Sequence, residues 1–172
     1  MMNRHIIAIT AGLFLMPSVA FTQNGYLGIG AGPANYSEAS FDESDTGFTL
    51  YGGIRIHENF ALELSYTDFG KQEGDYNSLN ASVEVTGLGF SALGILPIND
   101  KFDIIGKIGF ISWDADVTLD SLTSSDDGTD LLYGIGAQYN INEAFTIRGV
   151  WEFVDLDEGD LDMFSINAQF NF

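Results

Sequence analysis

The sequence predicts an all-β protein that folds as a single eight-stranded antiparallel up-and-down transmembrane β-barrel. Three observations predict this fold. Apolar and polar residues alternate with a period of two, and this alternation recurs in eight segments. Short connections between the segments alternate along the chain with longer polar ones. Most segments exceed the roughly 9–11 residues that a tilted membrane-spanning strand needs. The segments cover residues 24–36, 46–57, 59–70, 80–96, 101–116, 129–141, 143–155 and 160–172.

The last segment has the clearest alternation. Phe164, Ile166 and Phe170 fall on one face of the expected strand, while Ser165 and Asn167 fall on the other. Segments 59–70 and 143–155 divide their apolar and polar residues in the same way. In hydrocarbon every backbone N–H and C=O needs an internal partner, and a closed barrel provides one because it has no free edge. We therefore expect lipid on the apolar face and a lumen of small and polar residues on the other.

Residues 1–20 are predicted to form a cleaved signal peptide. Arg4 supplies a positive start, an apolar stretch runs from Ile6 to Met16, and Ser18-Val19-Ala20 offers small residues for cleavage. An uncleaved membrane anchor is the alternative, but the apolar stretch is short for it. Residues 21–172 would then form one barrel domain, exported to the outer membrane of a Gram-negative bacterium.

The charge is strongly negative and unevenly placed. Six Lys and Arg against 25 Asp and Glu give a net charge of −19, which disfavours nucleic acid as a partner. Cysteine is absent, so disulfides and thiolate metal sites are excluded, and we expect no cofactor. Most of the carboxylates lie at or beside four connections, at about 37–45, 71–79, 117–128 and 156–159. We expect these connections to be loops in the water outside a membrane.

One acidic stretch is a weak candidate for a metal site. Asp126, Asp127 and Asp130 lie close together, in or just beside the third of these connections. Hard divalent cations prefer oxygen ligands, and such ions would bridge the loops or link them to lipopolysaccharide phosphates. The stretch lacks a full calcium-loop pattern, so a solvated acidic loop is favoured over a defined site.

Five charged residues fall on the polar phase of the expected strands. They are Arg55, Glu63, Lys107, Arg148 and Glu152. An unpaired buried charge costs several kcal/mol, so we predict an ion-pair network across the lumen, with Arg55 and Glu63 pairing across a tight turn. The interior of an eight-stranded barrel is just wide enough for side chains, so this network would plug it. The alternative is that these residues lie on a solvated sheet face.

A soluble eight-stranded barrel such as a lipocalin is the rival fold. It would turn its apolar phase inward around a ligand, and its outer wall would be rich in charge. Here the middles of the segments carry few charges on either face. The membrane barrel is therefore favoured.

Three functions are compatible with such a barrel. The favoured one is a non-enzymatic structural or surface-interaction role. A narrow pore for small solutes is the first alternative. A lipid-modifying outer-membrane enzyme is the second, and it is disfavoured because those chemistries usually use histidine as general base. The sequence has two histidines: His5 lies in the predicted leader and His57 in a short turn.

Two stretches of the chain resemble the OmpA-like family of small outer-membrane barrels. The segment from Gly47 to Gly70 resembles the second and third strands of that family, where an E-x-x-Y-x-x-x-G strand recurs, and Glu63, Tyr66 and Gly70 match it. The segment from Gly87 to Phe110 resembles the fourth and fifth strands, with Lys107 directed inward.

The end of the chain adds to this resemblance. Phe170 and Phe172 are similar to the C-terminal signal that the outer-membrane assembly machinery recognises. The resemblance implies an outer-membrane barrel without the peptidoglycan-binding domain that larger members carry after it, because the sequence stops at Phe172. The partners it implies are outer-membrane lipids, lipopolysaccharide and the assembly machinery.

Overall fold

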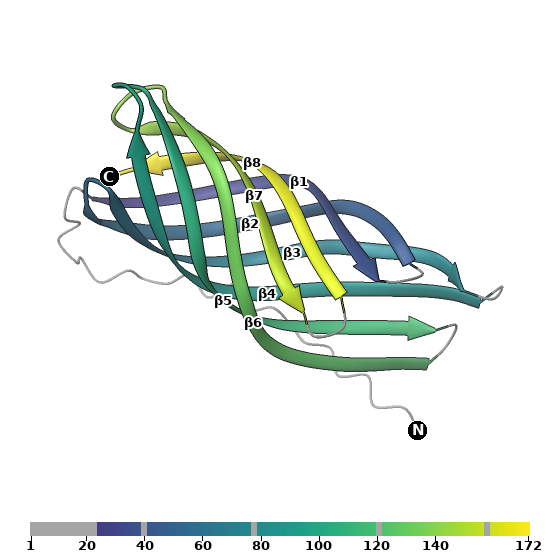
Figure 1. Ribbon diagram of the computed structural model, residues 1–172. Helices are drawn as coiled ribbons and strands as arrows, with labels where there is room; N and C mark the ends of the chain where they lie inside the picture. Colours follow the sequence, from purple (N-terminus) through teal and green to yellow (C-terminus); the bar gives the residue numbers. More distant parts are fainter. Residues whose placement is uncertain (1–23, 39–40, 77–78, 120–121, 157–158) are drawn as a thin grey trace, which may run out of the picture.

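The computed structural model describes residues 24–38, 41–76, 79–119, 122–156 and 159–172, which form a closed antiparallel barrel (Figure 1). Each strand pairs with its neighbours in the chain, and β8 closes the barrel against β1. The eight-stranded barrel predicted from the alternation is confirmed. No helix long and apolar enough to cross a membrane occurs among these residues. The strands are β1 (Gly25–Glu38), β2 (Phe41–His57), β3 (Phe60–Tyr76), β4 (Leu79–Pro97), β5 (Phe102–Leu119), β6 (Leu122–Asn140), β7 (Phe145–Leu156) and β8 (Gly159–Asn171).

Three tight turns and both ends of the barrel chain gather at one end of the molecule. At two of the turns an asparagine side chain accepts two backbone N–H groups: Asn99 from Lys101 and Phe102, and Asn142 from Ala144 and Phe145. Asparagine favours turns because its side chain can replace backbone hydrogen bonds in this way. The N–H of Gly25 donates to the carbonyl of Phe172 at 3.0 Å, which joins the two ends of the barrel wall. We call this end the turn end.

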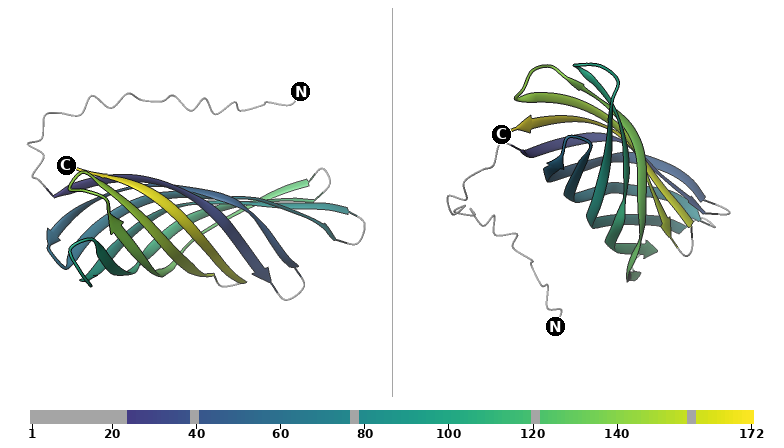
Figure 2. Two further views of the ribbon diagram at one scale, coloured as in Figure 1. Left: turned by 90° about the horizontal axis from the view of Figure 1, so that it is seen from above. Right: turned by 60° about the vertical axis from the view of Figure 1, so that its left-hand side comes forward.

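At the opposite end, three of the connections predicted to be loops are largely strand. β5 and β6 pair as far as Leu119 and Leu122, and β3 and β4 as far as Tyr76 and Leu79. Figure 2 shows these two hairpins projecting beyond the hairpin of β7 and β8. The prediction of loops was wrong because a backbone ladder does not require apolar side chains. Where both faces of a ribbon are wet, the alternation that reveals a strand is lost.

One irregularity in the wall requires a glycine. The pairing of β3 with β4 shifts register between Asp68 and Lys71, and Gly70 has a φ of 81° there. Its N–H donates to the side chain of Asp68 at 2.9 Å. A residue with a side chain rarely adopts this φ, so glycine is needed at this bulge.

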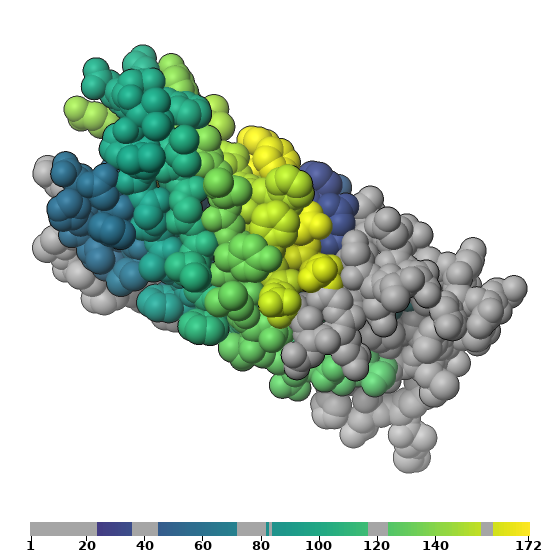
Figure 3. Space-filling model, in the orientation of Figure 1, coloured from purple at the N-terminus to yellow at the C-terminus, as the bar shows by residue number. Residues whose placement is uncertain are grey.

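The apolar phase of the strands faces outward. In β8, Phe164, Ile166 and Phe170 are 43–54% exposed, whereas Ser165 and Asn167 are at most 3% exposed. The space-filling view shows the side chains of β5 to β8 forming an unbroken outer wall (Figure 3). A lipocalin-like arrangement, with the apolar phase inside, is thereby excluded. The lumen is the remaining place for buried chemistry.

Candidate functional site

Four charged side chains meet in the middle of the lumen. The Glu63 carboxylate lies 3.1 Å from the Lys107 ammonium and 2.7 Å from the Arg148 guanidinium, and Lys107 also contacts Glu152 at 2.5 Å. All four residues are buried. We call them the ion-pair layer. Its two carboxylates balance its two cations, as a buried group of charges requires.

The strand register explains how the side chains of two non-adjacent strands meet. Lys107 on β5 lies opposite Gly134 on β6, and Gly134 lies opposite Glu152 on β7. Gly134 has no side chain to occupy the space between them. The Lys107 side chain therefore crosses β6 and reaches Glu152. A larger residue at 134 would contact Glu152 itself.

Two tyrosine rings hold Arg148 from the other side. The guanidinium carbon lies 5.4 Å from the centre of the Tyr26 ring and 4.9 Å from that of Tyr51, within the range of cation–π attraction. The Tyr26 hydroxyl donates to Glu63 at 3.1 Å. Tyr26 lies opposite Gly53, and Tyr51 lies opposite Gly28. The two glycines leave the room that the rings fill.

This packing predicts that adding a single methyl group at Gly53 destabilises the barrel. A Cβ at Gly53 would overlap the Tyr26 ring and lie 2.6 Å from the carbonyl oxygen of Leu62. We expect Gly53→Ala to lower the free energy of unfolding by about 1–3 kcal/mol, as overpacking does. The matched control is Gly94→Ala on the outer wall, where a Cβ meets no atom within 4 Å among the described residues. Equal midpoints of the two variants in urea unfolding would contradict this packing.

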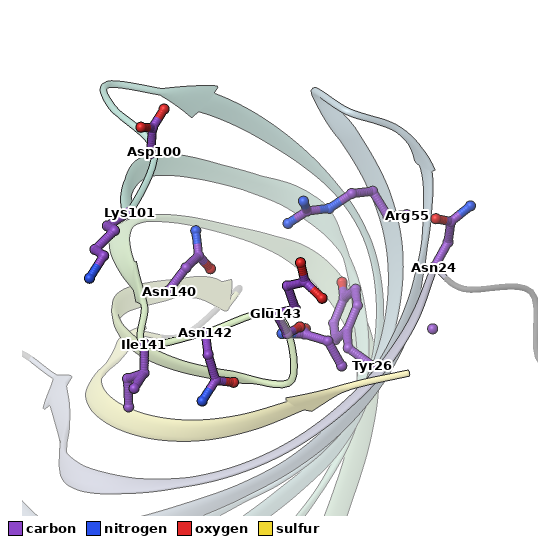
Figure 4. A pocket seen from close by; sticks show the side chains of 11 residues that line it. Asn24, Tyr26, Arg55, Asp100, Lys101, Asn140, Ile141, Asn142 and Glu143 are labelled. Atoms are coloured by element: carbon purple, nitrogen blue, oxygen red, sulfur yellow. The ribbon is translucent and has the colours of Figure 1, made fainter.

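Arg55 lies apart from the ion-pair layer, which corrects the expectation that it pairs with Glu63. Its register partner on β3 is Ala61, and the pairing of β2 with β3 shifts just beyond it, between Arg55 and His57. Glu63 is occupied by Lys107 and Arg148. Arg55 instead lines a cavity of about 450 Å³ at the turn end, together with Glu143 and Lys101. Figure 4 shows Arg55 and Glu143 extending toward the middle of this opening.

The lumen contains more apolar side chains than the small and polar ones expected from the sequence. On the turn side of the ion-pair layer, β3, β4 and β5 contribute Ala61, Leu93, Ile95 and Ile105 to one buried apolar cluster. On the far side lies a second cluster, which includes Phe69, Ile111, Leu132 and Met163. The sequence offered a signal for the second cluster, because alternation fails at Leu131-Leu132 and Phe153-Val154, where both phases are apolar.

The candidate metal residues do not converge. Asp126 and Asp127 are successive residues of β6, so their side chains point to opposite faces of the ribbon. The carboxylate of Asp130 accepts a hydrogen bond from the indole N–H of Trp113 at 2.6 Å. Within the parts of the chain that the structure describes, no group of three acidic or histidine side chains is placed to hold a metal ion.

The closed barrel, its apolar outer wall and its charged lumen agree with the comparison to protein families. The model of the outer membrane protein beta-barrel domain matches residues 6–172. The chain belongs to this family. Its barrel therefore lies in the bacterial outer membrane, with lipid against the apolar wall. In outer-membrane barrels the short turns face the periplasm, so the turn end is periplasmic and the projecting hairpins are extracellular.

Known members of the outer-membrane barrel family resemble the chain at low identity. Outer membrane protein A of Serratia marcescens is 26% identical over 141 residues, which cover 78% of this chain and 37% of that protein. The protein of the same name from Shigella flexneri is 23% identical over 163 residues, covering 86% of this chain and 47% of that protein. The chain thus spans less than half the length of these relatives.

Solved structures of outer-membrane barrels share the fold. Ail, the attachment invasion locus protein of Yersinia pestis, superposes with a TM-score of 0.64 at 18% identity, covering 88% of this chain and 100% of Ail. Neisserial surface protein A gives a TM-score of 0.69 at 15% identity, covering 86% of this chain and 97% of that one. At this identity the likeness concerns the fold alone.

Two predictions at the ends of the chain stay predictions. The leader at residues 1–20 lies outside the described residues. At the other end the Phe170 ring faces outward and contacts the rings of Phe145 and Phe172, at centroid distances of 5.4 and 6.2 Å. A role for Phe170 and Phe172 in assembly of this barrel is not tested by their geometry.

Proposed function

We propose that the protein is a non-enzymatic structural and surface-interaction protein of the outer membrane. The barrel is the anchor and its lumen is closed by side chains. Its acidic extracellular hairpins, which we call the extracellular ribbons, meet the surroundings. The observation that carries this proposal is the filled lumen. A balanced ion-pair layer lies between two apolar clusters, and the cavity within the layer measures only about 10 Å³. That volume holds about one water molecule.

A narrow pore is the alternative, and conductance separates the two functions. In planar bilayers we expect the wild-type barrel to insert without steady openings, because a solute would have to displace the side chains that fill the lumen. Heat-modifiable gel mobility of the reconstituted sample verifies that the barrel is folded. Steady openings from folded, inserted protein would favour the pore and refute the closed lumen.

The position of histidine supports a non-enzymatic role. His57 lies at the turn end, where its ring nitrogen accepts the backbone N–H of Asn59 at 3.3 Å. It is far from the extracellular rim. His5 lies outside the described residues. A histidine general base at the extracellular end is therefore lacking among the residues whose positions are described.

The charge of the extracellular ribbons favours cationic partners. Asp114, Asp116, Asp126 and Asp127 are exposed, and Asp114 lies directly opposite Asp127. Ail has been solved in complex with the heparin analogue sucrose octasulfate. The ribbons of this chain would repel such a polyanion. Divalent cations would gather there diffusely, and through them the ribbons would contact lipopolysaccharide phosphates.

The negative charge of the extracellular ribbons predicts which polyelectrolyte the protein binds. At low salt, vesicles carrying the barrel should bind polylysine and not heparin, and the binding should fall as salt screens the charges. The double variant Asp114→Asn/Asp127→Asn should weaken polylysine binding. Glu143→Gln, which neutralises a carboxylate at the periplasmic end, should not. Binding of heparin by the wild type would contradict the proposed surface role.

A further inference from the structure

An apolar ring closes the lumen on the extracellular side of the ion-pair layer. Its nine buried residues come from seven of the eight strands. The remaining strand, β2, contributes Gly47, where an added Cβ would contact the Met163 side chain. Side chains from around the barrel therefore pack together here, and the cluster itself contains no polar side chain to guide water through it. Its residues are Ala34, Phe69, Val85, Ile111, Ala115, Leu132, Val154, Leu161 and Met163.

The periplasmic side of the layer differs, because a track of polar groups leads inward from the mouth. Asn140 lines the mouth cavity and donates to Asp103 at 3.0 Å. Gln138 donates to the same carboxylate at 2.8 Å, and Thr146 donates to Asn140 at 2.9 Å. Gln138 in turn lies directly opposite Arg148. Hydrogen-bonding groups thus continue from the mouth to the ion-pair layer along β6 and β7.

Two atoms at the inner end of this track lack partners. The side-chain oxygen of Gln138 and the Nε of Arg148 are buried and have no hydrogen-bond partner among the described residues. One is an acceptor and the other a donor, and directly opposite residues of antiparallel strands have Cβ atoms only about 4.5–5.5 Å apart. Leaving either atom unpaired is unfavourable, because a buried donor or acceptor without a partner has lost its hydrogen bonds to water. A single water molecule between them would satisfy both.

We propose that the lumen is a half-channel for water. Periplasmic water enters along β6 and β7 as far as the ion-pair layer, and one bound water bridges Gln138 and Arg148. The barrier to passage is the apolar ring and not the ion pairs. This inference rests on the proposed closed lumen and assigns the closure to one set of side chains.

The absence of cysteine from the chain allows a direct test. Thr146→Cys and Val154→Cys are a matched pair, since both residues lie on β7, face inward and are 2% exposed. Thr146 lies on the polar track and Val154 in the apolar ring. Each variant is placed in lipid nanodiscs, which leave both mouths accessible, and treated with Ag⁺. Remaining thiol is measured with a maleimide after unfolding, and gel mobility verifies the fold of each variant.

We expect Ag⁺ to modify Thr146→Cys at least about tenfold faster than Val154→Cys, because only the first site is reached without local opening of the wall. Equal rates, or a slower rate at 146, would overturn the half-channel. A fast reaction at 154 without conductance would refute the ring as barrier and leave the closed lumen standing. Fast reaction together with steady conductance would refute both.

The bound water has its own readout in the wild-type barrel. Proton NMR in nanodiscs should show magnetisation transfer between water and the Nε–H of Arg148. Lack of that transfer, with the Nε–H signal resolved, would overturn the bridging water. Gln138→Leu, which removes its acceptor, should weaken the transfer.

Discussion

Replacing Glu63 by Gln is expected to lower the free energy of unfolding by about 3–5 kcal/mol. Glu63 is the carboxylate shared by Lys107 and Arg148, and among the described residues it is the only carboxylate paired with Arg148. Its neutralisation would leave two buried cations against the single charge of Glu152. Removing one partner of a buried ion pair costs about this much because the remaining charge stays away from water. The fluorescence of Trp113 and Trp151 in a urea titration of the vesicle-bound barrel measures the change.

Two further variants separate the charge effect from other causes. Glu84→Gln makes the same substitution at an exposed site on β4 and should change the free energy of unfolding by less than about 0.5 kcal/mol. Glu63→Gln combined with Arg148→Met restores the charge balance, so its cost should be smaller than the sum of the two single costs. Additive costs, or a loss at Glu63→Gln no larger than at Glu84→Gln, would refute the buried ion-pair argument.

The fold could be predicted because the geometry of a membrane barrel determines the pattern of apolar and polar residues along each strand. Each residue of a spanning strand faces either lipid or the lumen, so the period of two in β8 separates Phe164 and Ile166 from Ser165 and Asn167. The same logic placed Glu63, Lys107, Arg148 and Glu152 inside, where the structure brings them together. Which face a residue takes depends only on its position along its own strand, so it can be predicted from a single sequence.

Other features depend on relations between strands, which phase does not give. Arg55 has the inward phase of β2, but its height along the barrel and the register shift at Arg55/His57 place it at the mouth. The contact of Lys107 with Glu152 requires Gly134 at the same level of the intervening strand. The strand stagger decides both relations. The apolar ring likewise appears only when residues of seven strands are brought together in the lumen.

The ends of the strands in the extracellular ribbons could not be predicted from the sequence for a different reason. Ser125 and Asp127 lie in a connection predicted to be a loop, yet they pair as regular strand with Asp116 and Asp114. Beyond the membrane both faces of a hairpin meet water, so side-chain polarity no longer distinguishes a strand from a loop. Their pairing is held by the backbone ladder that continues from the barrel wall. Composition alone therefore places the boundary of the membrane and not the end of the strand.

Replacing Phe69 by Ala tests the apolar ring in the same way that Glu63→Gln tests the ion pairs. Phe69 is 3% exposed and packs within the ring, so truncation should leave a cavity and lower the free energy of unfolding by about 3–5 kcal/mol. Phe90→Ala is the matched control, because Phe90 lies on the outer wall and is 53% exposed to lipid. Lipid tails can fill the space that its ring leaves, so we expect a clearly smaller loss. Urea titrations of both variants in vesicles of one lipid composition measure the difference.

The ring also gives Phe69→Ala a second expected result. If the ring is the barrier to water, the cavity left by Phe69 should speed the reaction of Ag⁺ with a cysteine at Val154, while Phe90→Ala should leave that rate unchanged. A loss of stability without faster modification would mean that the ring packs but does not govern access. Equal losses for Phe69→Ala and Phe90→Ala would mean that the interior of this barrel is no better packed than its lipid-facing wall. The ion-pair layer would then be the main source of order in the lumen, and Glu63→Gln should remain costly where Phe69→Ala is not.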